Sequence, residues 1–162
     1  MKQKENVLNQ LQSMGFDPIE IPGLGHRFEF EDVNYLYMPD DDDERFLRIA
    51  IPRLLDVTDA NRVAVLNAMQ ETGQIVKYSK VCMMYEAPWA IYEHRLSSSE
   101  DLDDLLEHII HVLKITASIF CKKAMGEDID FPSDESETDI DDELDAELQK
   151  LFESMGDMEE YE

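Results

Sequence analysis

The stretch HRFEFEDVNYLYMPDDDDERFLRIAI, residues 26–51, decides the fold. Hydrophobic and charged side chains alternate over residues 26–30, and apolar runs follow at 35–38 and 46–51. A period of two is typical of β-strands that bury one face. The links between the three runs are short and rich in acidic residues, which favours antiparallel hairpins. The stretch therefore predicts three consecutive antiparallel strands.

Segments on both sides of this stretch have helical spacing. Before the strands, the apolar residues of a first helix lie about one turn apart, and Gly15 can close it: Val7, Leu8, Leu11 and Met14. After the strands, Thr58 or Asp59 can cap a helix that runs to Thr72, and Gly73 is its predicted stop. One side of this second helix carries a row of apolar residues: Ala60, Val63, Leu66 and Met69.

The rest of the body predicts two more strands and a long helix. The strands cover about residues 75–84 and 89–96, and the helix follows Ser98 or Ser99 and is closed by Gly126. The order is helix, three strands, helix, two strands, helix, which is typical of the α+β class. We therefore expect a single antiparallel sheet of about five strands with the helices on one face.

The negative charge of the chain is distributed unevenly. The 162 residues carry a formal net charge of −24, but residues 127–162 hold 17 acidic residues and one basic residue. Residues 1–126 therefore account for only −8. We expect a folded domain over 1–126 and an acidic tail over 127–162, disordered to about residue 140. Because a polyanion is not attracted to nucleic acid or to an anionic membrane, neither is expected as a partner.

The end of the tail carries a single apolar stripe on an acidic background. Its spacing predicts an amphipathic helix over residues 141–155. A helix of about 15 residues barely forms alone in water, so docking in a groove of its own body, of a second subunit or of another protein would stabilise it. The docking residues would be Leu144, Leu148, Leu151, Phe152 and Met155. The alternative is a solubilising tail with an incidental helical pattern.

The sequence contains no assembled set of catalytic residues. It has neither a Gly-rich phosphate loop nor a Gly-x-Ser-x-Gly elbow. Cys82 alternates within a strand pattern, where a free thiol packs as a small hydrophobe. His108 and His111 lie on one side of the last helix and could bind a metal, although the polar stripe of an amphipathic helix also explains them. The acidic run 40–44 lacks the ligand spacing of a calcium loop and reads as a solvated turn. We expect no catalysis, no cofactor and no metal.

The strands carry bulky side chains on both faces, which points to a partner site. If Leu47 and Ile49 pack under the helices, Phe46 points the other way, and alternation allows four tyrosines to share that outer face. The candidate partner-binding surface is then Tyr35, Tyr37, Phe46, Tyr78 and Tyr92. The alternative is that these rings are single surface aromatics or part of one core, because sequence alone does not determine strand register.

The last helix is apolar over more than one stripe, so we expect it to be buried on two sides. A second subunit would supply the extra burial, and the first helix of the same chain is the alternative. Its apolar stretch 109–120 is interrupted by polar residues and is not expected to span a membrane. The N-terminal residues lack the apolar core of a signal peptide, so a cytoplasmic protein is expected.

This order of elements resembles the type III secretion chaperone-like fold, a group that includes small acidic secretion chaperones and the YbjN-like proteins. The resemblance covers residues 3–125, from the first helix through the hairpin pattern over 26–51 to the last helix. It implies a homodimer whose surface holds a segment of another polypeptide and uses no cofactor. The acidic tail departs from the pattern, because such chaperones typically end near their last helix. YbjN-like relatives outside secretion systems are therefore the closer match.

The sequence thus leads us to expect a non-enzymatic protein-binding module that holds a segment of a partner polypeptide as a homodimer. A different class of function is an acidic decoy that occupies a basic, nucleic-acid-binding surface of another protein. Salt would distinguish the two, because decoy binding should weaken steeply as the salt concentration rises. A third possibility, a metal-dependent enzyme that uses His108 and His111, would be tested by metal analysis of the purified protein.

Overall fold

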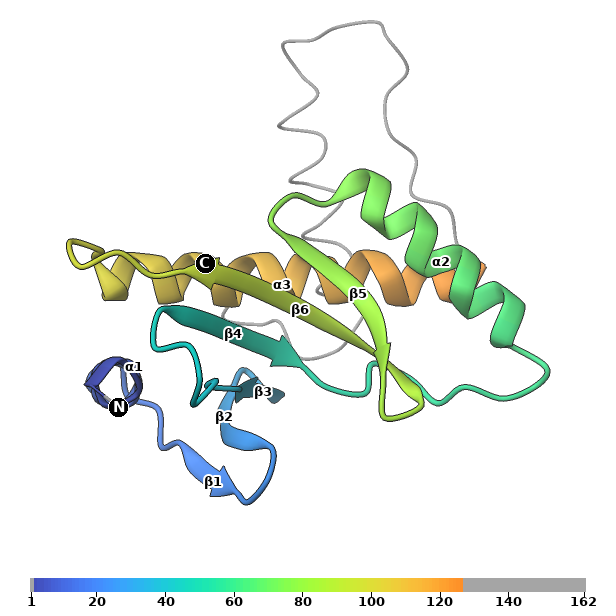
Figure 1. Cartoon of the computed structure of the whole chain (residues 1–162). Coiled ribbons are helices and arrows are strands. Elements are labelled where there is room, and N and C mark those ends of the chain that lie inside the picture. Colours follow the sequence, from blue (N-terminus) through green and yellow to red (C-terminus); the bar gives the residue numbers. More distant parts are fainter. Residues whose placement is uncertain (1, 127–162) are drawn as a thin grey trace, which may run out of the picture.

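A computed structural model describes residues 2–126 of the chain (Figure 1). The elements are α1 (Lys2–Ser13), β1 (Ile19–Ile21), β2 (Gly25–Phe30), β3 (Val33–Tyr37), β4 (Phe46–Ile51), α2 (Arg62–Ile75), β5 (Ser79–Met84), β6 (Ala87–Arg95) and α3 (Leu102–Ala124). All the strands join one antiparallel sheet in the order β1-β2-β3-β4-β6-β5. The expected α+β class with a single antiparallel sheet is therefore confirmed.

The sheet has six strands, because the short strand β1 pairs with β2 at one edge. The spacing of Pro18, Pro22, Gly23 and Gly25 predicts a loop here, and that prediction is wrong for residues 19–21. Three residues are too few to display an alternating pattern, and Pro18 and Pro22 on either side favour a loop. Both prolines lie outside the ladder, where a missing backbone N–H costs nothing.

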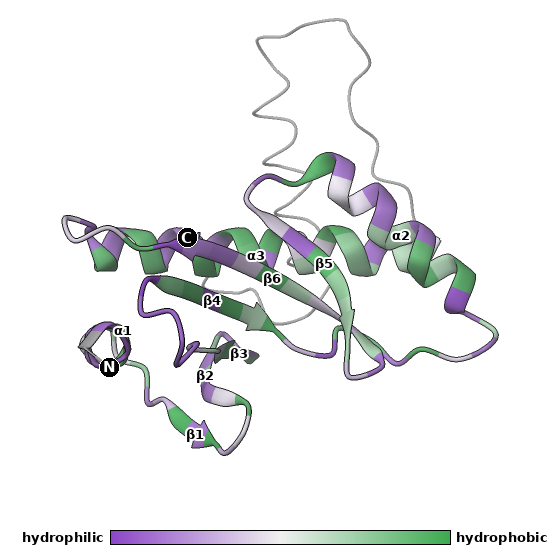
Figure 2. Ribbon diagram, viewed as in Figure 1, coloured by the Kyte–Doolittle hydropathy of each residue, from purple (hydrophilic) through white to green (hydrophobic). Residues whose placement is uncertain are grey.

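The helices pack on one face of the sheet. α3 runs behind β4 and β6 in Figure 1, α1 lies at one end of the sheet, and α2 packs against α3 and β5. One core cluster joins residues of α1 and α3 to the covered face, including Leu11, Phe28, Leu47, Ile49 and Leu113. Figure 2 shows hydrophobic residues concentrated in β4 and recurring along α3. The core thus lies between this face and the two helices.

The register of the strands places three of the predicted outer tyrosines on the covered face. Tyr37 pairs with Ile49, and Ile49 pairs with Tyr92, so these residues share one face of the sheet. Tyr35 is two residues from Tyr37 on the same strand and is fully buried. The predicted common outer face is therefore wrong for Tyr35, Tyr37 and Tyr92.

The opposite face of the sheet carries a second apolar cluster. It consists of Leu36, Met38, Ala50, Ala87, Trp89 and Ile91, all of them buried. Side chains from both margins of the sheet pack against it, including Leu24 near one edge and Met84 at the other. Within residues 2–126, none of the three helices contributes to this cluster. β3 and β4 are thus buried on both faces, which explains their nearly continuous hydrophobic runs.

α2 differs from its prediction in both end and orientation. It continues past Gly73 to Ile75, so the expected stop at that glycine is wrong. Its buried side consists of Val65, Ala68 and Thr72, which face α3 and β5. Of the predicted apolar row, Met69 is half-buried, whereas the side chains of Val63 and Leu66 are 70% and 47% exposed.

α3 is covered largely by other parts of the same chain. Its first half packs on α1, and Phe120 in its second half packs on Val65 and Ala68 of α2. Its N-cap is Asp101, two or three residues later than expected, and the carboxylate accepts a hydrogen bond of 3.2 Å from the backbone N–H of Asp104. The apolar surplus of α3 thus needs no second subunit. Among the described residues, no helix is long and apolar enough to cross a membrane.

Candidate partner-binding groove

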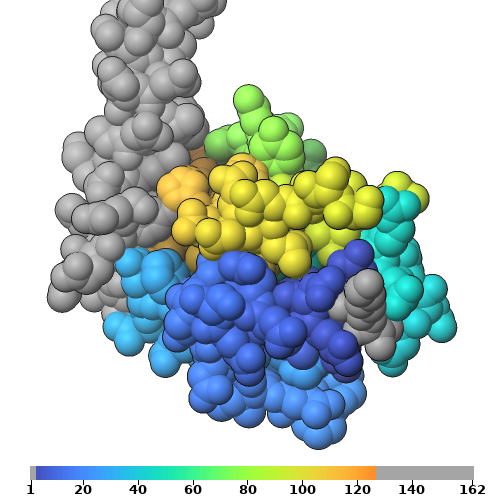
Figure 3. All heavy atoms as spheres, turned by 90° about the vertical axis from the view of Figure 1, so that its left-hand side faces the viewer, coloured from blue at the N-terminus to red at the C-terminus, as the bar shows by residue number. Residues whose placement is uncertain are grey.

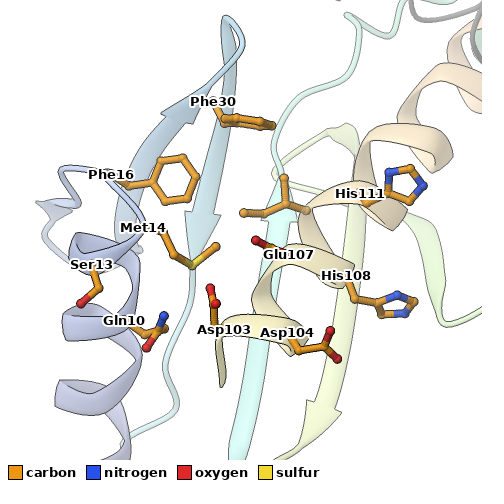
Figure 4. Close-up of a pocket in the computed structure, with 11 residues that line it drawn as sticks. Gln10, Ser13, Met14, Phe16, Phe30, Asp103, Asp104, Glu107, His108 and His111 are labelled. Carbon is orange, nitrogen blue, oxygen red and sulfur yellow. The ribbon is translucent and has the colours of Figure 1, made fainter. Parts of the chain in front are cut away.

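A groove of about 790 Å³ separates the end of α1 from the first half of α3 (Figure 4). Figure 3 views the molecule from this side and shows α1, in blue, directly against the yellow start of α3. The groove has an apolar wall formed by Met14, Phe16 and Phe30, and Ile110 of α3 also lines it. Its other wall is acidic and contains Asp103, Asp104 and Glu107. Its volume lies within the usual range for ligand sites and suits a few inserted side chains.

A helix stop positions Phe16 in the apolar wall. Gly15 has φ of 95°, and the backbone N–H of Phe16 donates a 3.0 Å hydrogen bond to the carbonyl oxygen of Leu11. This is the Schellman geometry, in which a left-handed glycine reverses the chain after a helix, so the predicted role of Gly15 is confirmed. The ring of Phe16 then lies 5.1 Å from that of Phe28 and 5.7 Å from that of Phe30, measured between centroids. The wall is therefore an extension of the aromatic core.

The acidic wall is formed by the first two turns of α3. Figure 4 shows Asp103 and Glu107 on the side of the helix that faces Met14, with Asp104 and His108 turned away. Among residues 2–126, none of the three acidic residues of the wall takes part in an ion pair. Within this part of the chain, no salt bridge neutralises their negative charge.

A buried ion pair fixes Phe30 at the end of the groove. Lys114 of α3 and Glu31 of the β2–β3 turn form a salt bridge, and the Lys114 side chain is only 2% exposed. The Nζ atom of Lys114 also lies 5.4 Å from the centroid of the Phe30 ring. Because Glu31 follows Phe30 directly, this contact links the apolar wall to α3.

Two of the predicted partner-binding residues, Tyr78 and Tyr92, form ring contacts with His108 near the groove. Tyr78 stacks on Tyr92 at 6.2 Å, and the His108 ring lies edge-on to both, at 5.3 Å and 5.9 Å. Tyr78 is 70% exposed and has φ of 71°, which is rare for an aromatic residue. Burial raises the pKa of Tyr92, and the neighbouring Tyr78 and Glu100 add to this effect. Tyr78 is thus the accessible member of the cluster.

The other three predicted residues are not brought together. Tyr35 and Tyr37 are buried beneath α3, and burial raises the pKa of Tyr37 to about 12. Phe46 lies at the start of β4 on the opposite face, where its ring centroid is 5.0 Å from the guanidinium carbon of Arg48. The structure therefore does not form the five-residue aromatic surface.

The predicted metal ligands and the two thiols can be compared with the described part of the chain. Residues 2–126 contain no group of three or more His, Cys, Asp or Glu side chains placed to bind a metal, so His108 and His111 are not part of such a group. Burial raises the pKa of the Cys82 thiol, and it raises that of Cys121 to about 11. Thiols with raised pKa values are poor nucleophiles at neutral pH.

Two acidic features predicted from the sequence remain, the run over 40–44 and the tail over 127–162, and the structure describes only the first. The run over 40–44 forms a turn, in which Asp40 Oδ1 accepts a 2.8 Å hydrogen bond from the backbone N–H of Asp42. The predicted solvated turn is thereby confirmed. The proposed docking residues of the tail lie outside the described residues: Leu144, Leu148, Leu151, Phe152 and Met155.

The groove itself was not predicted from the sequence. A usable signal for Phe16 was its position directly after the helix-stopping Gly15, where hydrophobic contacts with the preceding helix are common. Glu107 offered no such signal, because an acidic residue on an exposed helix face is ordinary. A comparison with protein-family models finds no match, and a comparison with curated protein sequences finds none either.

Proposed function

We propose that this protein is a non-enzymatic binding module that holds a segment of a partner polypeptide in the groove between α1 and α3. One observation carries the proposal: a half-buried apolar wall faces an acidic wall across a groove of about 790 Å³, and the acidic wall forms no ion pair with any of residues 2–126. Apolar anchors in a pocket with charged groups at its margin are the usual composition of a protein-binding site.

The energetics of such a site suit reversible binding. Met14, Phe16 and Phe30 are only partly buried, so an inserted side chain would cover their remaining apolar surface. Fully burying one aliphatic or aromatic side chain contributes roughly 1.5–3 kcal/mol. Two or three anchors, less the entropy lost on association, correspond to a moderate affinity. This is the behaviour expected of a module that holds and releases a segment.

We further propose that the protein works as a homodimer that forms through the outer side of α2. Val63 and Leu66 lie about one turn apart there, with side chains that are largely exposed. A symmetric dimer covers such a stripe with its own copy, because the same patch contributes from both subunits. The resemblance of the element order to secretion chaperones and YbjN-like proteins also supports a dimer.

The groove proposal is tested with peptides selected against the full-length protein from a random display library. We expect the selected peptides to bind at least about tenfold more weakly to Phe16→Ala and to Met14→Ala. The control is Tyr85→Ala, which removes an exposed aromatic ring at the β5–β6 turn, away from the groove. Fluorescence anisotropy measures affinity, and a thermal melt verifies folding. Peptides that bind both groove variants as well as the unchanged protein would contradict the proposal.

A further inference from the structure

We infer that the partner segment is cationic and amphipathic, with an apolar anchor flanked by Lys or Arg. This inference rests on the proposed function and specifies the chemistry of the occupant. The groove offers apolar contact from Met14, Phe16 and Phe30, and negative charge from Asp103 and Glu107 on the facing side of α3. A segment that satisfies both walls must carry both kinds of side chain.

Desolvation makes the acidic wall selective. When a partner covers Asp103 and Glu107, each carboxylate loses water, and this costs free energy unless a cation or donor replaces it. Neither residue forms an ion pair within residues 2–126, so a partner must supply the compensation. A Lys or Arg side chain does so, whereas an acidic segment adds repulsion.

The helix dipole does not account for the whole acidic wall. Asp101 caps α3, and Asp103 and Asp104 lie in its first turn, where negative charge stabilises a helix. Glu107 lies beyond the first turn, where the dipole effect has faded. Lys114, about two turns further along α3, is already paired with Glu31. Glu107 thus adds negative charge to the groove without a structural role in capping.

Charge also favours an external occupant over the acidic tail of this chain. Residues 127–162 carry 17 acidic residues and one basic residue, so their charge has the same sign as the wall. The net charge of −24 further raises the concentration of cationic segments near the surface. A tail in the groove would need its apolar stripe to outweigh this repulsion.

The test uses the full-length protein and three labelled synthetic peptides of equal length. The first combines Leu and Lys in an amphipathic pattern, the second replaces Lys by Glu, and the third replaces Leu by Ser. At an ionic strength of about 0.15 M, we expect the Leu/Lys peptide to bind at least about tenfold more tightly than the others. We expect Asp103→Lys/Glu107→Lys to lose this preference and to gain affinity for the Leu/Glu peptide.

Two further variants separate local from global charge. Asp103→Asn/Glu107→Gln removes the wall charge without placing a cation at the helix N-terminus, and it should also bind the Leu/Lys peptide less tightly. Asp41→Lys/Asp42→Lys changes the net charge as much as the double Lys variant does, but in the exposed turn over 40–44. We expect this control to retain most of the affinity and the peptide preference.

The outcomes distinguish the inference from the proposed function. Equal losses of affinity for the Leu/Lys peptide in the groove variant and in the turn control would show that only net charge matters, and would overturn the inference.

If the Leu/Glu peptide binds as tightly as the Leu/Lys peptide and both depend on Phe16, the groove binds peptides but the cationic inference is wrong. If no peptide depends on Phe16 or Met14, the proposed function itself fails. If Leu148→Ser/Leu151→Ser tightens the binding of every peptide, the occupant is the tail, and the inference is overturned.

Discussion

At the scale of single residues, two glycines of this protein differ in whether a side chain would fit at their position. A Cβ atom at Gly25 in β2 would collide with the backbone carbonyl oxygen of Tyr37, which belongs to the adjacent strand β3. A Cβ atom at Gly73 in α2 would meet nothing within 4 Å. Backbone cannot move aside as the end of a flexible side chain can, so the first position is restricted to glycine.

We expect Gly25→Ala to lower the free energy of unfolding by about 2 kcal/mol or more, because the collision forces the two strands apart. Gly73→Ala is the matched control and should raise it by up to about 1 kcal/mol, since alanine favours the helix. Urea unfolding followed by the fluorescence of the single tryptophan, Trp89, measures both, because its side chain is buried. Equal effects of the two substitutions would contradict the geometry.

The ion pair between Glu31 and Lys114 is a second residue-scale determinant. Glu31 occupies a left-handed position with φ of 51°, which is unfavourable for a residue with a side chain. The salt bridge to Lys114 helps to offset that cost and holds the turn against α3.

We expect Lys114→Met to reduce stability by about 3 kcal/mol, the lower end of the range for buried pairs, because Glu31 keeps some contact with water. The double variant Glu31→Gln/Lys114→Met should recover part of this loss, since it leaves no unpaired charge. Thermal or urea unfolding of the unchanged protein, Lys114→Met, Glu31→Gln and the double variant completes a double-mutant cycle. A double variant as unstable as the sum of the two single variants would show that the residues do not interact.

At the scale of elements, the spacing of hydrophobic residues determined which segments form helices and strands. The register between strands determined which side chains face the helices, and this spacing alone does not show it. The helices have a period near 3.6 and β2 a period of two, whereas β3 and β4 are short apolar runs between turns. The sequence predicted the three helices and the five longer strands from these patterns. β3 has large side chains on both of its faces, so alternation alone did not show whether Tyr35 or Leu36 faces the helices. The cross-strand pairing of Tyr37 with Ile49 decides this, and such pairing is not encoded within one strand.

An ion-pair network joins three neighbouring strands, and it should be sensitive to pH. Glu93 of β6 accepts hydrogen bonds from Arg48 of β4 and Lys80 of β5, at N–O distances of 2.6 Å and 2.9 Å. Burial opposes ionisation of Glu93, but the hydrogen bonds and positive charges of Lys80 and Arg48 outweigh it and lower its pKa below 4.5. A carboxyl with a lowered pKa stabilises the fold above its ordinary pKa and loses this effect as the pH falls through the lowered value.

We expect Glu93→Gln to reduce stability by about 1–2 kcal/mol at pH 7, where the ionised carboxylate accepts charged hydrogen bonds. The difference from the unchanged protein should shrink as the pH falls from 4.5 through the lowered pKa of Glu93, where the folded protein takes up the proton. Urea unfolding at a series of pH values measures it, and Glu29→Gln on the exposed part of β2 is the control. A difference that stays constant down to acidic pH would contradict the role of the charge.

At the scale of the whole molecule, the candidate site arises from residues that are distant in sequence. Phe16 follows α1, Phe30 ends β2, and Glu107 lies in α3, so only the packing of these elements creates the groove. Each residue has an ordinary local explanation in the sequence. The expected aromatic surface, in contrast, relied on strand faces that the register reversed. Local patterns therefore identified the elements but not the surface that they form together.

The same packing changes the argument for a dimer, because α3 is covered within the chain and the exposed apolar stripe is on α2. We expect the unchanged protein to have twice the mass of one chain in light scattering, and Leu66→Lys to shift it toward the mass of a single chain. A buried lysine opposite its own symmetry copy is both desolvated and repelled, so one substitution acts twice per interface.

Ile19→Lys, at the exposed position on β1, is the control and should leave the mass unchanged. A single-chain mass at every concentration would refute the dimer, and a dimer indifferent to Leu66→Lys would place its interface elsewhere.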